Sequence, residues 1–432
     1  MRLICCGLFA VVSALQAWCS QFEASKMNTP HAGAAHFVAT SIEKRCGVPI
    51  WSAPALLFGG EVSNSAIARF PSVGVSEAEV LVVGSNLRSF SEPIERSGLL
   101  STLLFGGNQI GSPAGNWFFM YPRALPNDDG SFTLVWAEPS SKIERIGAYE
   151  WGQLTPQSLW VADYTVPSGW TLPQRIYDGP VLWTDRPGEK IVRTRDGVAH
   201  LIFAVLEVQS SLKHASRRNG MWSVASIPET PRAVYASSVA YGDTLIVGYI
   251  GAVGGGSGQD RNSVFVLRST DRGETWKHPE LIRRSRALGA FDLAMAGDQL
   301  GKVHLLWSQE TAGGNRSIVH VVSRNSGNDW EQPKHVTNEV SFNIAPAAAV
   351  DRCGRLHVVY REIQDAGKTG RIVHALWDEE WSSPTMLFAD LLTSGPLITA
   401  LADGRLLILF LGRPNDSLSS THFSSLFSIS IP

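Results

Sequence analysis

Trp276-Lys277-His278-Pro279 is followed by Trp330-Glu331-Gln332-Pro333 and then by Trp381-Ser382-Ser383-Pro384, at spacings of 54 and 51 residues. An aromatic residue with proline three positions later also occurs upstream, as Trp51-Ser52-Ala53-Pro54, Trp170-Thr171-Leu172-Pro173 and the substituted copy Phe90-Ser91-Glu92-Pro93. A seventh copy, Trp222-Ser223, has lost the proline. A period close to 50 residues is typical of a fold built from one repeated supersecondary unit. The repeat therefore favours one large domain over several unrelated ones.

A second pattern accompanies each aromatic–proline pair: a short apolar strand, a turn with Asp or Gly, and a second apolar strand. Residues 345–351 lead in this way through Gly354 to residues 356–360. The predicted turns recur at Glu77, Gly130, Gly197, Gly242, Gly301, Gly354 and Gly404. Both strands are apolar at most positions, which indicates burial on both faces. We expect an all-β fold, a six- or seven-bladed β-propeller of four-stranded antiparallel blades, with seven repeats counted and the aromatic–proline pair beginning each fourth strand.

The two ends of the repeat array are incomplete in complementary ways. Trp51 has no hairpin before it, and the last hairpin, near 396–411, is followed by one clear strand at about 421–430. Residues 51–58 also match residues 381–388. We therefore predict that the N-terminal strand completes the last blade and closes the ring, which removes an exposed sheet edge. The segment 59–120 is poorly spaced, and without it the count is six blades.

The N-terminus predicts export. Residues 1–20 combine Arg2, a short apolar run over 3–15 and small residues near Ser20, the pattern of a signal peptide that is too short to span a bilayer. Residues 21–47 are a polar lead-in, and residues 48–432 form the single propeller domain. We expect a secreted or periplasmic protein. In that compartment Cys46 and Cys353 either form one disulfide or are two unpaired buried thiols.

The composition of the chain limits the classes of partner that it can bind. The 432 residues are 44% hydrophobic and 18% charged, with a net charge of −2. This describes a core-forming chain without the basic surface that a nucleic acid requires. We expect no nucleic-acid partner, no membrane span and no cofactor or metal. His200, His304 and His357 share one repeat position, at the start of the second strand, and this recurrence favours a structural role over metal binding.

One turn between predicted third and fourth strands carries a full signature, Ser269-Thr270-Asp271-Arg272-Gly273-Glu274-Thr275-Trp276, and residues 323–330 are a worn copy. This stretch resembles the Asp-box (BNR) repeat of the sialidase, or neuraminidase, superfamily of β-propellers. The resemblance implies a structural role on the outer rim for Ser269, Asp271, Gly273, Thr275 and Trp276. It supports the fold more than an activity.

Candidate ligand-binding residues follow from the predicted topology. The first strand of a blade begins, and the second ends, at the same pole, so polar residues at those places converge on one central mouth. This set contains Arg123, Arg193, Asp292, Glu138, Glu207, Glu310, Arg361, Glu362 and Arg413, with Tyr360 and Trp307 just inside. Arginine suits a carboxylate and an aromatic face suits a sugar ring. The set predicts a pocket for a glycan or a small anionic ligand.

The sialidase resemblance also implies a catalytic arrangement of three arginines on the substrate carboxylate, an Asp acid/base and a Tyr–Glu nucleophile pair. By position, Arg123, Arg361 and Arg413 would be the clamp, Tyr360 with Glu362 the nucleophile pair, and Asp292 the acid. The family's Arg-Ile-Pro context is absent, since residues 121–126 read Tyr-Pro-Arg-Ala-Leu-Pro. The main hypothesis is a sialidase-like propeller that recognises a glycan. The alternatives are a glycoside hydrolase of exo-α-sialidase type and a non-enzymatic scaffold with a protein partner.

Overall fold

The computed structural model describes 18 segments of the chain. These are residues 55–58, 67–75, 79–87, 97–103, 110–115, 117, 119–127, 129–139, 156–166, 168–183, 191–253, 262–285, 288–298, 300–364, 369–389, 395–401, 404–412 and 425–430. The predicted signal peptide and lead-in, Trp51, Cys46, Glu77 and Arg413 lie outside them. Cys353 is disulfide-bonded, and the other cysteines of the chain also lie outside the described residues.

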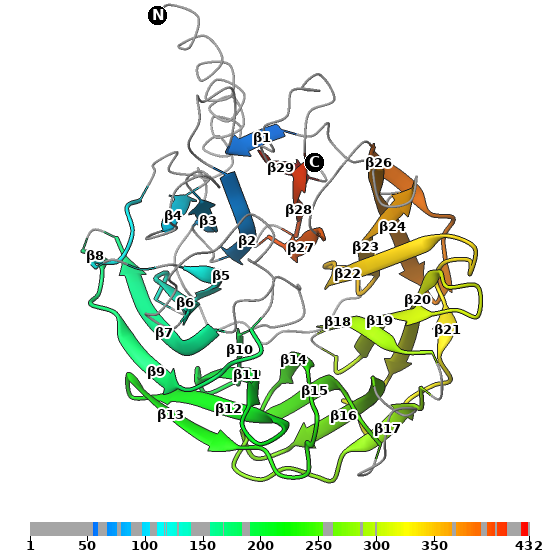
Figure 1. Cartoon of the computed structure of the whole chain (residues 1–432), viewed down its shortest axis with the longest axis horizontal. Coiled ribbons are helices and arrows are strands. Elements are labelled where there is room, and N and C mark those ends of the chain that lie inside the picture. Colours follow the sequence, from blue (N-terminus) through cyan, green and yellow to red (C-terminus); the bar gives the residue numbers. More distant parts are fainter. Residues whose placement is uncertain are drawn as a thin grey trace, which may run out of the picture.

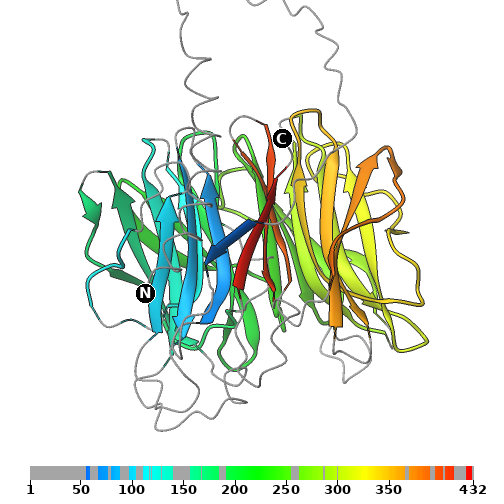
Figure 2. The same cartoon turned by 90° about the horizontal axis from the view of Figure 1, so that it is seen from above.

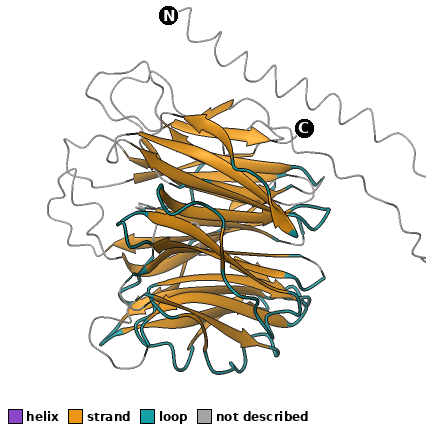
Figure 3. Ribbon diagram, turned by 90° about the vertical axis from the view of Figure 1, so that its right-hand side faces the viewer, coloured by secondary structure: helices purple, strands orange, loops and turns teal. Residues whose placement is uncertain are grey.

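The described part is all-β, with antiparallel four-stranded sheets as its main unit and no helix (Figure 3). The first sheets are β2 (Ile67–Val75), β3 (Val80–Leu87) and β4 (Ser97–Leu103); then β5 (Met120–Pro126), β6 (Phe132–Pro139), β7 (Pro156–Thr165), β8 (Gly169–Trp170) and β9 (Gln174–Asp178); then β10 (Ile191–Arg193), β11 (Ala199–Leu206), β12 (Ser210–Arg218) and β13 (Met221–Ser226). The next comprises β14 (Tyr235–Tyr241), β15 (Thr244–Gly251), β16 (Ser263–Ser269) and β17 (Glu280–Arg283).

The largest sheet divides into two groups, because a single parallel pair, Arg316 with Phe342, joins them. One group is β18 (Ala290–Gly297), β19 (Val303–Glu310), β20 (Arg316–Ser323) and β21 (Lys334–His335); the other is β22 (Phe342–Val350), β23 (Leu356–Gln364), β24 (Thr369–Asp378), β25 (Glu380–Trp381) and β26 (Thr385–Ala389). The last sheet is β27 (Leu397–Ala400), β28 (Leu406–Gly412), β29 (Ser425–Ser430) and β1 (Ala55–Phe58). In it the N-terminal β1 pairs with β29, as the sequence predicts.

These groups follow one another around a common centre (Figure 1) and stand side by side in Figure 2. The first strands of successive groups contact each other in the order β2, β5, β10, β14, β18, β22 and β27, and β27 in turn contacts β2. The aromatic–proline pairs lie where the sequence predicts wherever they are described: Pro173 directly precedes β9 and Pro384 directly precedes β26, both outer strands. The repeat period therefore corresponds to one group of strands.

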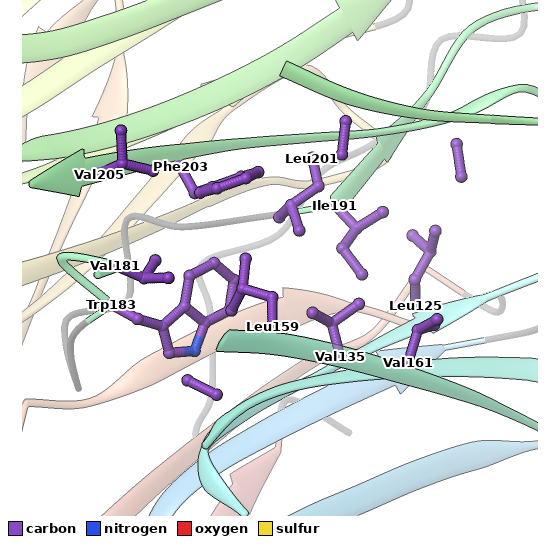
Figure 4. Close-up of a cluster of buried hydrophobic side chains, with 13 residues drawn as sticks. Leu125, Val135, Leu159, Val161, Val181, Trp183, Ile191, Leu201, Phe203 and Val205 are labelled. Atoms are coloured by element: carbon purple, nitrogen blue, oxygen red, sulfur yellow. The ribbon is translucent and has the colours of Figure 1, made fainter. Parts of the chain in front are cut away.

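Apolar side chains fill the space between neighbouring sheets. Along β11, Leu201, Phe203 and Val205 face the sheet of β5–β9 and pack there with Val135 and Leu159 (Figure 4). The alternate residues of the same strand, among them Ile202 and Ala204, pack against β14–β16 on the other side. Each fully buried aliphatic side chain contributes about 1.5–3 kcal/mol relative to exposure. Successive residues of this antiparallel strand are all buried because neighbouring sheets cover both faces of its own sheet.

The hairpins between first and second strands turn at glycine. Six predicted turn glycines adopt φ between 59° and 87°, a region that favours glycine: Gly130, Gly197, Gly242, Gly301, Gly354 and Gly404. The amide of Gly354 donates to the carbonyl of Asp351, whose side chain accepts from the amides of Cys353 and Arg355. In this turn the aspartate accepts amide hydrogens and the glycine adopts the left-handed conformation.

The turn between β16 and β17 is held by the residues of the predicted Asp-box. Ser269 donates to Asp271 at 2.7 Å and accepts from the amide of Gly273 at 2.8 Å. Asp271 also accepts from the amide and the hydroxyl of Thr275. Trp276 packs edge-on against His214 in the core between two sheets. The turn at 323–330 has the same bonding, with Asn325 in the place of the aspartate.

Buried histidines recur as stacked pairs across the second and third strands of three groups. The ring nitrogens lie 2.9–3.0 Å apart in His200–His214, His304–His320 and His357–His374. Burial lowers the pKa of His200 and His304 to about 3 and that of His214 to about 4. The described residues contain no group of three His, Cys, Asp or Glu side chains arranged to hold a metal ion. The shared repeat position thus corresponds to a shared packing role.

We predict that Gly273→Ala destabilises the protein far more than Gly220→Ala. Both glycines have φ near 80°, where alanine costs about 1–2 kcal/mol. A Cβ at Gly220 meets open space, whereas a Cβ at Gly273 overlaps the packed ring of His214. Urea unfolding should give a loss of about 1 kcal/mol for Gly220→Ala and about 3 kcal/mol for Gly273→Ala. Equal losses would contradict this packing of the turn.

We also predict that stability falls as the pH is lowered from 7 to 5. The folded protein holds these histidines with a pKa far below the value near 6.5 of the unfolded chain, so protons bind preferentially to the unfolded state. The stabilisation is complete above pH 6.5 and is lost toward pH 3–4, by up to about 1.4 kcal/mol per pH unit for each buried histidine. Urea titrations across this range measure it. A double His304→Gln, His320→Gln variant should show a smaller slope, and a slope equal to wild type would contradict the assignment.

Candidate functional site

Most candidate residues lie at one end of the sheets, where first strands begin and second strands end; we call this end the mouth pole. Arg193, predicted to lie there, is instead the last residue of β10, where it pairs with Ala199 beside the hairpin and donates to the carbonyl of Gly197. Cross-strand pairs define the mouth pole, among them Met120 with Ala137, Ala290 with Gln309 and Asn343 with Glu362. Four first strands carry a β-bulge there, and in three of them one described residue has φ near 50°: Tyr121, Asp292 and Ala345. Bulges bend a strand and redirect its side chains. The sequence pattern gives no sign of these bulges.

Arg123 and Asp292 are buried and bonded to the protein itself. The Arg123 guanidinium donates to the carbonyls of Tyr121 and Pro122, and it lies 5.8 Å from the ring centroid of Trp183. Asp292 is 1% exposed and accepts from the amide of Ala345, which belongs to the next group of strands. The Asp292 contact joins two neighbouring groups at the mouth pole, whereas Arg123 bonds within its own strand, β5.

Trp307, proposed to stack on a sugar, is fully buried. Its ring belongs to the apolar cluster between the β14–β17 and β18–β21 groups, and its Nε1 donates to Gln309 at 3.1 Å. In the sequence, an aromatic residue near a strand end looks the same whether it packs in the core or faces a ligand. Trp307 packs in the core because both faces of its sheet are covered. The side chain stabilises the interior and presents no face to the mouth.

Two glutamates at the ends of second strands accept hydrogen bonds from backbone amides. Glu138 accepts from the amide of Phe119 at 3.0 Å, and Glu310 accepts from the amide of Gly289 at 3.2 Å. Glu362 ends the second strand of its own group but makes no such bond among the described residues. Its only ion pair there is a long one, 3.8 Å to Arg371, with the glutamate side chain 21% exposed. Glu207, in turn, pairs with Lys213 at 2.8 Å.

Tyr360, Arg361 and Glu362 are consecutive on β23 and therefore alternate between its faces. Tyr360 packs with Leu306 and Ile318 of the preceding group. Arg361 points to the opposite face, on which Val359 packs against the last sheet. The sheet itself thus separates the predicted clamp arginine from the predicted Tyr–Glu pair. Arg371, which the sequence did not single out, lies directly across from Glu362 on β24.

Arg361 is a half-buried cation without a counter-charge in the described part of the chain. Its neighbours on the adjacent strands are Ile344 and Ile372, and no described carboxylate or carbonyl accepts from its guanidinium. Burial alone lowers the pKa of this arginine from its ordinary value. Taking a charge partly out of water without giving it a partner costs free energy. Such an arrangement is retained where a ligand supplies the missing charge, and Arg361 is the strongest anion-binding candidate at the mouth pole.

No family model and no curated protein matches the sequence of this chain. Several solved structures are similar to it in fold. Among solved structures, a polysaccharide lyase described as PL25 ulvan lyase is 13% identical, covers 84% of this chain and 95% of its own, and gives a TM-score of 0.55. The polysaccharide lyase Uly1 is 10% identical over 87% of this chain and 91% of its own, with a TM-score of 0.55. The NanB sialidase of Streptococcus pneumoniae is 13% identical over 88% and 70%, with a TM-score of 0.45.

The two neighbours with a TM-score of 0.55 are polysaccharide lyases, and the likeness of this chain to them is one of fold. The described residues also include no helix long and apolar enough to cross a membrane.

We predict that Arg361→Leu leaves the free protein as stable as wild type or stabilises it by about 1 kcal/mol, because an uncompensated charge is replaced by an apolar side chain. Arg217→Leu is the matched control. Arg217 pairs with Asp163 at 2.5 Å, and its loss should cost about 2 kcal/mol. Urea unfolding of both variants measures the difference. A loss of more than 1 kcal/mol in Arg361→Leu would show that Arg361 has a structural role.

Proposed function

We propose that this chain is an exported, seven-bladed β-propeller that binds an acidic glycan at its mouth pole, with Arg361 as the ligand of a carboxylate or sulfate group. The observation that carries the proposal is the absence of any counter-charge around Arg361 among the described residues. Its planar guanidinium offers several donors in a geometry that matches these anions.

Three observations support the architecture and location within this proposal. Seven groups of strands contact one another in a closed order through their first strands. The N-terminal strand completes the last group, as ring closure in a propeller requires. Cys353 is disulfide-bonded, which fits an oxidising compartment outside the cytosol.

The fold neighbours support an acidic glycan as the ligand class. One polysaccharide lyase of the same fold was solved with a glucuronate–rhamnose 3-sulfate oligosaccharide bound. We propose binding and not sialidase-type hydrolysis, because a carboxylate held by Arg361 would lie across β23 from Tyr360. Arg123, the other described member of the predicted clamp, already donates to backbone carbonyls.

The test compares two matched glycans on the full protein. A sulfated glucuronate tetrasaccharide should bind, and its carboxyl-reduced, desulfated counterpart should bind far more weakly. Arg361→Gln should weaken binding of the acidic glycan by roughly 10- to 100-fold, the loss expected for a hydrogen bond to a charged group. Titration calorimetry gives both affinities.

Arg283→Gln is the control, since Arg283 is exposed on the outer strand β17 and should bind like wild type. Equal affinity for the two glycans, or no effect of Arg361→Gln, would overturn the proposal. Release of the fluorophore from a fluorogenic sialoside would support the hydrolase alternative instead.

A further inference from the structure

A pocket of about 300 Å³ lies between the β18–β21 and β22–β26 groups, on the face of β23 opposite Arg361. One wall is the connection from β21 to β22, with Thr337, Asn338 and Ser341. The other wall is formed by β23 and β24 and by the residues that open β26. Its volume is at the lower end of small-molecule sites, so it fits one ring-sized molecule and not a chain.

Tyr360 lines this pocket. Its side chain is 3% exposed and its ring packs in the apolar cluster with Val358 and Val373. The hydroxyl makes no hydrogen bond with any described residue. The pocket, which the tyrosine lines, is the place from which a ligand can supply a hydrogen-bond partner. Burial also raises the pKa of Tyr360, so the hydroxyl stays protonated and can donate.

Glu362 and Arg371 are the two charged residues of the lining. Their charges balance, and their 3.8 Å separation leaves carboxylate and guanidinium able to bond elsewhere. An anion in the pocket is repelled by Glu362, and a cation by Arg371. A neutral ligand with neighbouring hydroxyls satisfies both, by donating to the carboxylate and accepting from the guanidinium. Val336, Val373 and Met386 supply an apolar wall for its carbon-bound hydrogens.

We propose that this inter-sheet pocket binds a small neutral polyhydroxyl ligand of monosaccharide size, through the Tyr360 hydroxyl, Glu362 and Arg371. The site is separate from Arg361, and the inference does not rest on the proposed function above.

The test is a ligand-observed NMR titration of the full protein with glucose, galactose, mannose and rhamnose, and with glucuronate, glucosamine and glycine as charged probes. At least one neutral sugar should bind with a Kd below about 10 mM, and in the Arg361→Gln variant it should bind more tightly than any charged probe. Tyr360→Phe removes only the hydroxyl and should weaken this binding about tenfold. Glu362→Gln leaves Arg371 without its counter-charge and should shift the preference toward glucuronate.

Tyr249→Phe is the matched control, because Tyr249 is equally buried but lies in another core, stacked on Phe265. It should bind sugar like wild type, and so should Arg361→Gln. The proposal fails if no neutral sugar binds, if a charged probe binds best to the Arg361→Gln variant, or if Tyr360→Phe and Tyr249→Phe bind alike. Unchanged unfolding curves for Tyr360→Phe exclude misfolding as the cause of a loss.

Discussion

Burial of both faces of every sheet is the constraint on which the remaining structure depends. Strand β11 sends alternate apolar side chains into two different cores, so its sheet is stable only with a neighbour on each side. The same requirement holds around the molecule and explains why β1 joins the strands at the other end of the chain. The buried His214 and the tryptophans at the ends of the turns 269–276 and 323–330 pack in the same interfaces.

This constraint decides what a polar residue at the mouth pole does. Most of these polar residues bond within the protein itself. Glu138 and Glu310 accept from backbone amides, and Asp292 joins two neighbouring groups. Arg361, Tyr360 and Glu362 depart from that pattern on one strand, β23, and on its two faces. A polar side chain that makes no such bond, where its counterparts in other repeats do, is a candidate for ligand binding. Comparison with the equivalent positions of the other repeats therefore identifies the residues of β23 as the exception.

The fold was largely predictable because its signals are local and repeated. The turn glycines and the outer strands after Pro173 and Pro384 follow from the residues at each position. The site was less predictable, because its geometry depends on bulges and register. Arg123 bonds to its own strand through a bulge that no residue pattern announces, and Trp307 is core because both faces are covered. Arg371 becomes a candidate site residue only when the register of β24 against β23 is known.

The most direct test of this account is a crystal structure of the protein with a sulfated glucuronate oligosaccharide. We predict a carboxylate or sulfate oxygen within hydrogen-bonding distance of the Arg361 guanidinium, with Tyr360 on the far side of β23 and out of contact with that group. An oligosaccharide bound elsewhere on the molecule, or Arg361 paired with a carboxylate of the protein itself, would contradict it.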